Sequence, residues 1–102
     1  HPQHELAKRQ KTNFSGMLTF QTRTKGPEIA ARMVEKLDVI HYAVSLGHHR
    51  SLIYWIGTDD IQQSTFRHDA EQLKRYREYA GDGVFRLSVG IENPDDLIAD
   101  LA

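Results

Sequence analysis

The feature that most constrains the fold is the stretch 81–92, Gly-Asp-Gly-Val-Phe-Arg-Leu-Ser-Val-Gly-Ile-Glu, in which apolar and polar residues alternate. The apolar positions of this alternation are Phe85, Leu87, Val89 and Ile91. Because successive side chains of an extended chain point to opposite faces, the pattern predicts a strand with one face on a core. Arg86, Ser88 and Gly90 share the other face, which is polar or bare.

Arg86 has two interpretations. A solvated surface arginine is the common case. However, Gly90 allows a ligand or another backbone to come close, and a guanidinium matches a carboxylate with two parallel hydrogen bonds. Arg86 is therefore a candidate anion-binding residue, with a plain surface position as the alternative.

Length and composition exclude several classes of protein. The 102 residues suffice for one small domain with a core, but not for a two-domain enzyme. The net charge of -1 gives no bulk attraction to nucleic acid or membrane. The absence of cysteine excludes disulfides and thiolate metal sites and is compatible with the cytosol. No apolar run approaches the roughly 20 residues of a membrane helix, so we expect a soluble, cytoplasmic protein.

Both ends of the chain are expected to be cut from a longer protein. The first residues are polar and of helical character, and the last ones fall inside an amphipathic helix without a C-cap signal. We therefore expect residues 1–102 to be a single domain and a fragment of a longer chain.

The remaining patterns predict alternating helices and strands. Helices are predicted over 4–10, 27–37, 69–80 and from 94 onward. Strands are predicted over 14–22, 39–46 and, as a short apolar strand, 52–56. Residues 57–67 show no readable pattern. This order predicts an α+β two-layer sandwich, with a mostly antiparallel sheet carrying helices on one face.

Familiar catalytic and metal-binding motifs are missing. His48 and His49 are adjacent, would point apart on a strand, and have no H-E-x-x-H or comparable spacing, so no metal site is expected. No serine stands in a nucleophile elbow, and the glycines form no dinucleotide fingerprint. Basic patches at 8–11 and 74–77 leave RNA binding as an alternative, against which the neutral charge balance argues.

Four segments, in order, resemble the C-terminal end of the Cys/Met-metabolism family of pyridoxal-phosphate (PLP) enzymes. They are H-P-Q-H-E-L-A at 1–7, F-S-G-M at 14–17, A-V-S-L-G at 43–47 with S-L at 51–52, and 81–92 followed by D-D-L-I-A-D-L at 95–101. The family includes cystathionine γ-synthase, cystathionine β- and γ-lyases and methionine γ-lyase. The resemblance implies the small C-terminal domain of a longer fold-type-I PLP enzyme of trans-sulfuration, usually a homotetramer.

The resemblance also implies site residues. In the family, the arginine of R-L-S-V-G binds the substrate α-carboxylate, and the S-L-G segment lies against that carboxylate and the cofactor ring. Carried over, the carboxylate ligand is Arg86, with Ser45 and Leu46 beside it and Ser45 also contacting PLP. Fixing the carboxylate would orient the substrate, while PLP acts as the electron sink.

The family's Schiff-base lysine lies upstream of His1. The resemblance therefore implies that this chain holds no catalytic residue and that alone it neither binds PLP nor catalyses a reaction. The implied partners are a small amino-acid substrate, the large PLP domain and further copies of the chain. Nucleic acid and membranes are not expected partners.

Two segments depart from the family's pattern. Residues 54–60 stand where commoner members carry a short E-H-P-A-x-M-T-H segment, and 48–50 replace small and acidic residues. Because both fall next to the expected pocket for the substrate side chain, His48 or Tyr54 is predicted to contact it. The substrate (cystathionine, methionine or an O-acylhomoserine) stays open, as does the choice between a lyase and a γ-synthase.

The alternative is a non-catalytic α+β protein-interaction module. In that case Arg86 would be a surface or salt-bridged residue, and the exposed sheet face would bind a partner.

Overall fold

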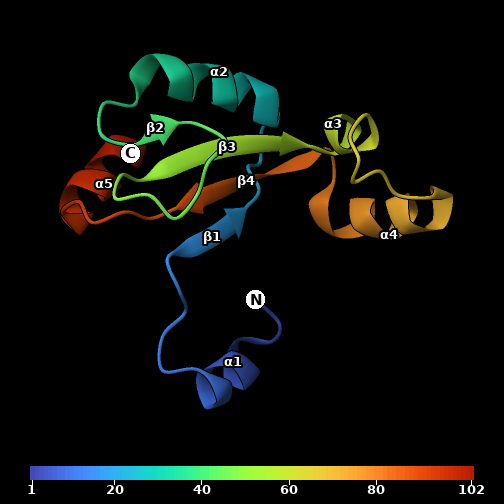
Figure 1. Ribbon diagram of the computed structural model, residues 1–102, viewed down its shortest axis with the longest axis horizontal. Coiled ribbons are helices and arrows are strands. Elements are labelled where there is room, and N and C mark those ends of the chain that lie inside the picture. Colours follow the sequence, from blue (N-terminus) through green and yellow to red (C-terminus); the bar gives the residue numbers. More distant parts are fainter.

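The computed structural model describes all residues, 1–102, and places five helices around one four-stranded sheet (Figure 1). The helices are α1 (His4–Gln10), α2 (Gly26–Lys36), α3 (Thr58–Gln62), α4 (Ala70–Ala80) and α5 (Pro94–Leu101). The strands are β1 (Met17–Phe20), β2 (His41–Tyr42), β3 (Leu52–Gly57) and β4 (Gly83–Ser88). None of the helices has the length and apolar character that a membrane crossing requires.

The alternating stretch forms β4, a central strand of the sheet. The strand order is β1-β4-β3-β2, and all neighbours are antiparallel except β2 and β3. β4 pairs with β3 from Gly57 opposite Gly83 to Leu52 opposite Ser88. The predicted α+β fold with a mostly antiparallel sheet is confirmed.

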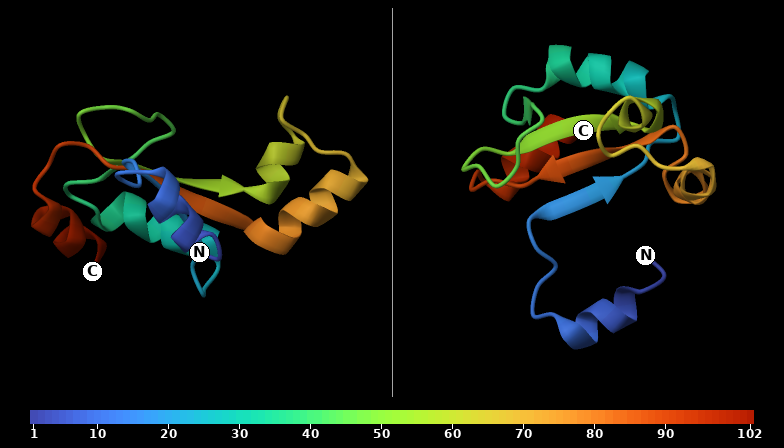
Figure 2. Two further views of the ribbon diagram at one scale, coloured as in Figure 1. Left: turned by 90° about the horizontal axis from the view of Figure 1, so that it is seen from below. Right: turned by 45° about the vertical axis from the view of Figure 1, so that its right-hand side comes forward.

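One face of the sheet carries the core. Phe85 and Ile53 are fully buried on this face, and the Phe85 ring packs between Phe20 and Trp55 at centroid distances of 5.5 and 5.0 Å. Helices α2 and α5 cover this face and lie on the same side of the sheet (Figure 2, left). The predicted placement of helices on one face follows from this apolar surface, because a helix is what removes it from water.

The helix ends follow signals in the sequence. Asp69 and Gln72 form a capping box at the start of α4, with hydrogen bonds of 2.8 and 3.1 Å. Gly81 ends α4 with a φ of 56°, which favours glycine. Asn93 caps α5, and Pro94 takes its first position.

Several predicted strands are shorter in the structure. The strands predicted over 14–22 and 39–46 shrink to Met17–Phe20 and His41–Tyr42, and β4 ends at Ser88. Alternation indicates an extended backbone, but a strand also needs a continuous ladder of hydrogen bonds to a neighbour. These flanks keep only single bonds, such as Val89 N–H to the Gly16 carbonyl and Ala43 N–H to the Ile53 carbonyl. Four large apolar residues of the predicted strands 39–46 and 81–92 are exposed: Val44, Leu46, Val89 and Ile91.

Two other segments are more ordered than predicted. The short strand expected over 52–56 is a full-length partner of β4, and the unreadable segment after it contains α3. Thr58 anchors α3, because its buried Oγ1 donates to the Gly81 carbonyl at 2.8 Å and its N–H donates to that of Asp82 at 2.9 Å. Hydrogen bonds between residues so far apart in the chain cannot be recognised from a local sequence pattern.

Two parts of the molecule extend away from the sheet. Helices α3 and α4 lie beyond one end of β3 and β4 (Figure 1), where Arg77 pairs with Asp59 at 2.6 Å and with Asp82 at 3.5 Å. Helix α1 stands apart from the sheet and has no buried residue. Its apolar side chains are therefore open to contact from outside the chain.

Candidate functional site

The sheet face opposite the core is not covered by α2 or α5 and is the candidate site, here called the open face. Arg86 of β4 lies on it, directly between Thr19 of β1 and Tyr54 of β3 in the strand register. The loop 43–51, which joins β2 to β3, lies on this side of the sheet (Figure 2, left). The open face is thus a strip of polar and aromatic side chains under one loop.

Arg86 is half-buried and has no carboxylate partner in the chain. Its guanidinium donates to the carbonyl oxygen of Val44, and none of the five salt bridges involves it. A guanidinium has five N–H donors in a fixed fork. Most of its donors are therefore left for a ligand, as expected for an arginine that receives a carboxylate from outside the chain.

Ser45 and Leu46 are exposed and are held beside Arg86 by the residues on either side of them. On one side, the Val44 carbonyl accepts from Arg86; on the other, Gly47 N–H donates to the buried Ser88 hydroxyl at 3.0 Å. Gly47 has a φ of 69°, so glycine suits this turn. The structure therefore brings together three of the predicted site residues, on one strand and one loop.

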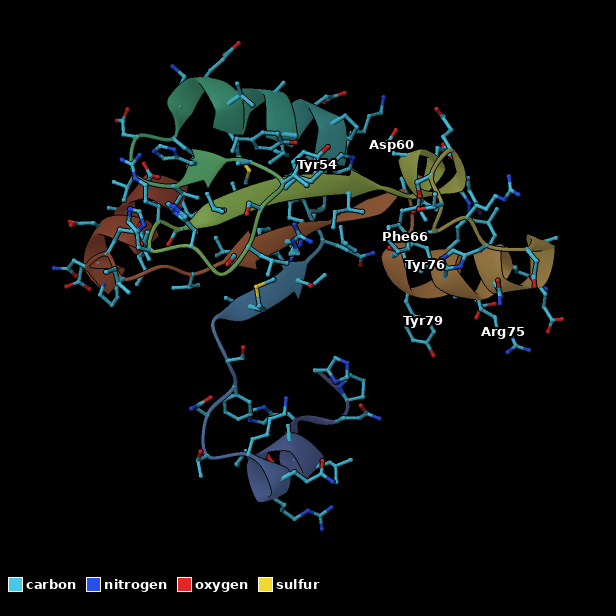
Figure 3. All side chains as sticks on the ribbon, in the orientation of Figure 1. Tyr54, Asp60, Phe66, Arg75, Tyr76 and Tyr79 are labelled. Carbon is cyan, nitrogen blue, oxygen red and sulfur yellow. The ribbon has the colours of Figure 1, made fainter.

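Tyr54 joins the same part of the open face. It lines a hollow of about 310 Å³ together with Arg86, Val44, Asp60 and Phe66. Figure 3 shows Tyr54 on β3, with Asp60 and Phe66 at the α3 and α4 end of the sheet. A ligand bound to Arg86 through a carboxylate could extend along this hollow toward α3.

His48 lies in the loop but does not line this hollow. Its Nδ1 accepts from the Arg50 N–H at 3.2 Å, and its ring lies 4.0 Å from that of His49. The two histidines would point apart on a strand, but this segment is a loop, where their rings lie side by side. No group of three or more His, Asp or Glu residues is arranged to hold a metal ion.

Sequence reasoning missed two residues that fix the loop. Ser51 is fully buried, and Glu92 accepts hydrogen bonds from both its backbone and its side chain. The Ser51 N–H hydrogen bond is the main cause that lowers the pKa of Glu92, so this carboxyl group ionises readily. The two residues are 41 positions apart, and nothing in the local patterns connects them.

The residues of the open face could form part of a PLP site but not a complete one. The Ser45 hydroxyl has no hydrogen-bond partner within the chain, so it and Arg86 could contact a cofactor and an anionic substrate. A Schiff base also needs a lysine. All the lysines are exposed and lie outside the sheet: Lys8, Lys11, Lys25, Lys36 and Lys74.

Comparisons with known proteins match the whole chain to one enzyme family. Residues 1–102 match the family model of Cys/Met metabolism PLP-dependent enzymes. The chain is 39% identical over 103 residues to canavanine γ-lyase of Pseudomonas canavaninivorans and 34% identical over 102 residues to O-succinylhomoserine sulfhydrylase of Pseudomonas aeruginosa. The alignments cover 99% and 100% of this chain and 24% of each relative.

A solved structure gives the same correspondence in three dimensions. The crystal structure of cystathionine γ-synthase from Xanthomonas oryzae pv. oryzae in complex with cystathionine matches with a TM-score of 0.70 and 34% identity. The match covers 99% of this chain and 24% of that one. The chain therefore spans about a quarter of the length of the relatives it matches.

Proposed function

Because the chain belongs to the family of Cys/Met metabolism PLP-dependent enzymes, we propose that it is the small C-terminal domain of a longer enzyme of that family. In this enzyme the domain binds the α-carboxylate of a sulfur amino acid. The observation that carries the proposal is the Arg86 guanidinium, which lies on the open face without a carboxylate partner in the chain.

The chain's own residues bind and orient the substrate. Arg86 offers the carboxylate two parallel, charge-assisted hydrogen bonds, and its planar fork fixes the plane of the bound group. Ser45 contacts the carboxylate and the edge of the cofactor, and Leu46 packs beside them. PLP, bound mainly by the rest of the enzyme, supplies the electron sink. Orientation by the domain thus presents the substrate α-carbon to groups that the longer enzyme provides.

Tyr54 and the α3 end of the hollow are proposed to receive the substrate side chain. Tyr54 shares the hollow with Arg86, so a carboxylate and a side chain of one ligand can reach both. His48 is proposed as a further contact from the loop. The relatives include a lyase and a sulfhydrylase, so the domain fits elimination and replacement alike, on cystathionine, methionine or an O-acylhomoserine.

The large PLP domain and further copies of the chain are the proposed protein partners. Apolar side chains are exposed on the N-terminal segment and on the loop over the open face, including Leu6, Phe14, Val44 and Leu46. Such a surface is typical of one that another domain or subunit covers. A homotetramer in the cytoplasm would complete the assembly. An isolated interaction module would also expose such a surface, but the relatives are enzymes, which favours the catalytic assignment.

The proposal is tested by ligand binding to the full-length enzyme purified with PLP. Glycine is the probe because it carries the α-carboxylate and no side chain, and methylamine is its counterpart without the carboxylate. Arg86→Ala should retain the visible absorbance of bound PLP, while the glycine concentration that perturbs the spectrum rises at least about 30-fold. The response to methylamine should stay unchanged.

Arg32→Ala is the matched control, because Arg32 is an exposed arginine of α2, which covers the opposite face of the sheet. It should behave as the wild type with both probes. An equal response of Arg86→Ala and the wild type to glycine would contradict the carboxylate role. A protein that binds no PLP at all would contradict the enzyme assignment.

A further inference from the structure

A closed set of hydrogen bonds ties the loop 43–51 to the chain just after β4. Glu92 Oε1 accepts from Ser51 N–H at 2.6 Å, and Oε2 accepts from the Ser51 hydroxyl at 2.9 Å. The hydroxyl oxygen of Ser51 in turn accepts from Gly90 N–H at 2.8 Å. We call these three residues, Glu92, Ser51 and Gly90, the Glu92 clasp. One carboxylate thereby joins two backbone segments.

The two segments are in direct contact at the clasp. A Cβ on Gly90 would overlap the His49 carbonyl oxygen and would lie 2.6 Å from Glu92 Oε2. Ile91 N–H donates to the same His49 carbonyl at 2.9 Å. Because Ser51 is fully buried between the segments, the end of the loop can move away from β4 only by breaking the clasp.

The clasp also acts on the residues that surround Arg86. Four attachments follow one another along the loop: the Val44 carbonyl to Arg86, Gly47 N–H to Ser88, the His49 carbonyl to Ile91 N–H, and the clasp itself. Only the clasp involves a carboxylate. If it opens, only the neutral hydrogen bonds at Gly47 and His49 hold the end of the loop, and the Val44 carbonyl is held less firmly beside Arg86.

We propose that Glu92 is a positioning residue for substrate binding. It holds the loop 43–51 on β4 and so fixes the Val44 carbonyl and the Arg86 guanidinium in the orientation that receives the substrate α-carboxylate. This inference rests on the proposed function of Arg86. It assigns no contact between Glu92 and the substrate.

The chemistry of the clasp predicts a graded series of variants. Glu92→Ala removes both acceptors and leaves the buried Ser51 N–H unpaired. Glu92→Gln can keep the shape of the clasp, because the amide oxygen accepts from Ser51 N–H and the amide N–H₂ donates to the Ser51 oxygen. The Gln variant loses the charge-assisted strength of the carboxylate but not the connection, so it should restore most of the function.

Asp100 provides a matched control. Its carboxylate also ties backbone segments, accepting from the N–H groups of Asp38, Val39 and Ile40 at 2.9, 3.1 and 2.8 Å. It joins α5 to the start of β2 and makes no hydrogen bond with the loop 43–51. Asp100→Ala therefore removes a comparable clasp that does not involve the loop beside Arg86.

The experiment uses the full-length enzyme and two readouts. Hydrogen exchange of the backbone amides, measured without PLP, reports whether residues 44–51 stay attached to the segment after β4. Titration with glycine, followed by the absorbance of bound PLP, reports carboxylate binding, with methylamine as the probe without a carboxylate. Glu92→Ala should speed exchange in 44–51 and raise the glycine concentration required about tenfold, with the methylamine response unchanged. Glu92→Gln should lie close to the wild type.

Asp100→Ala should speed exchange around 38–40 and leave the glycine titration unchanged. The proposal is overturned if Glu92→Ala frees the loop without weakening glycine binding, if it leaves exchange in the loop unchanged, or if Asp100→Ala weakens glycine binding equally. These results differ from a failure of the proposed function, in which Arg86→Ala itself leaves the glycine titration unchanged.

Discussion

The two faces of the sheet are built from the same strands and are completed in different ways. Phe85 and Ile53 face α2 and α5 and are fully buried, whereas Arg86 and Tyr54, one step along the same strands, stay half-exposed under a loop. The core face is covered by helices α2 and α5 of this chain, and the open face is not. Substitutions at adjacent positions of β4 should therefore affect different properties: stability on one face, ligand binding on the other.

The largest effect is expected at Phe85. Phe85→Ala leaves a cavity between Phe20, Trp55 and the helices, and should lower the free energy of unfolding by about 3–5 kcal/mol. Denaturant unfolding of the full-length enzyme measures it, with Phe85→Leu as the milder control. A loss below about 1 kcal/mol would mean that the core face is not closed as described.

The next largest effect is expected at Arg86, the residue after Phe85, and concerns ligand binding. Arg86→Lys keeps the charge but loses the planar fork, so glycine should bind about 10- to 100-fold more weakly than in the wild type. The free energy of unfolding should change by less than about 0.5 kcal/mol, because the side chain is only half-buried. If Arg86→Lys lowers stability as much as Phe85→Ala does, the distinction between the two faces fails.

A smaller loss of stability is expected where α2 meets the core face. A Cβ at Gly26 would overlap the Trp55 indole, so Gly26→Ala must displace the ring or the start of the helix. Overpacking of this kind costs about 1–3 kcal/mol. Thermal unfolding compared with that of Ala31→Gly, an exposed position on α2, separates overpacking from helix propensity. A neutral Gly26→Ala would show that the indole can move freely.

The smallest effect concerns the pH dependence of stability. Two carboxylates contribute to it: Glu92, which holds the loop over the open face, and Asp100 of α5, a helix on the core face. Hydrogen bonds from Ser51 lower the pKa of Glu92. Burial raises the pKa of Asp100, but the N–H groups of Ile40, Asp38 and Val39 outweigh it, so that pKa is lowered as well. Both groups therefore contribute stability above their unfolded pKa values, about 4.3 and 3.9, and lose it as pH falls through the folded values.

Unfolding midpoints measured from pH 7 down to pH 3 should fall less steeply in Glu92→Gln and in Asp100→Asn than in the wild type. The wild type should show little change between pH 7 and 6, because both carboxyl groups are ionised there. Parallel curves for all three proteins would contradict a stabilising role for either ionised group.

The sequence predicted the two faces of β4 better than it predicted what covers them. Alternation is a local property of the chain, so it placed Arg86 opposite the face of Phe85 and Leu87 correctly. It could not separate paired from unpaired extended segments, which is why the predicted strand 39–46 includes Val44 and Leu46, both of which lie in the loop. The loop owes its position to hydrogen bonds between residues about 40 positions apart, and such bonds have no local pattern.

The candidate site was predicted in part for the same reason. Arg86 was a candidate from the residue pattern as well as from the family motif, whereas Ser45 and Leu46 were candidates from the motif alone. The roles assigned to all three stay predictions. Ser51 and Glu92 belong to the same motif segments, but their contact appears only when the loop and the end of β4 are placed together. The segment 57–67 gave no signal because α3 is short and is fixed mainly by Thr58.

The position of Trp55 has a consequence for how related chains can diverge. Its indole fills the space in which a side chain on Gly26 or on Gly83 would lie. Gly83 also has a φ of 154°, so the backbone requires glycine there whatever residue occupies position 55. Gly26 is constrained by the ring alone. A lineage that replaces Trp55 by a smaller residue should thus become free to vary at position 26 but not at 83, and Trp55→Leu should relieve the defect of Gly26→Ala.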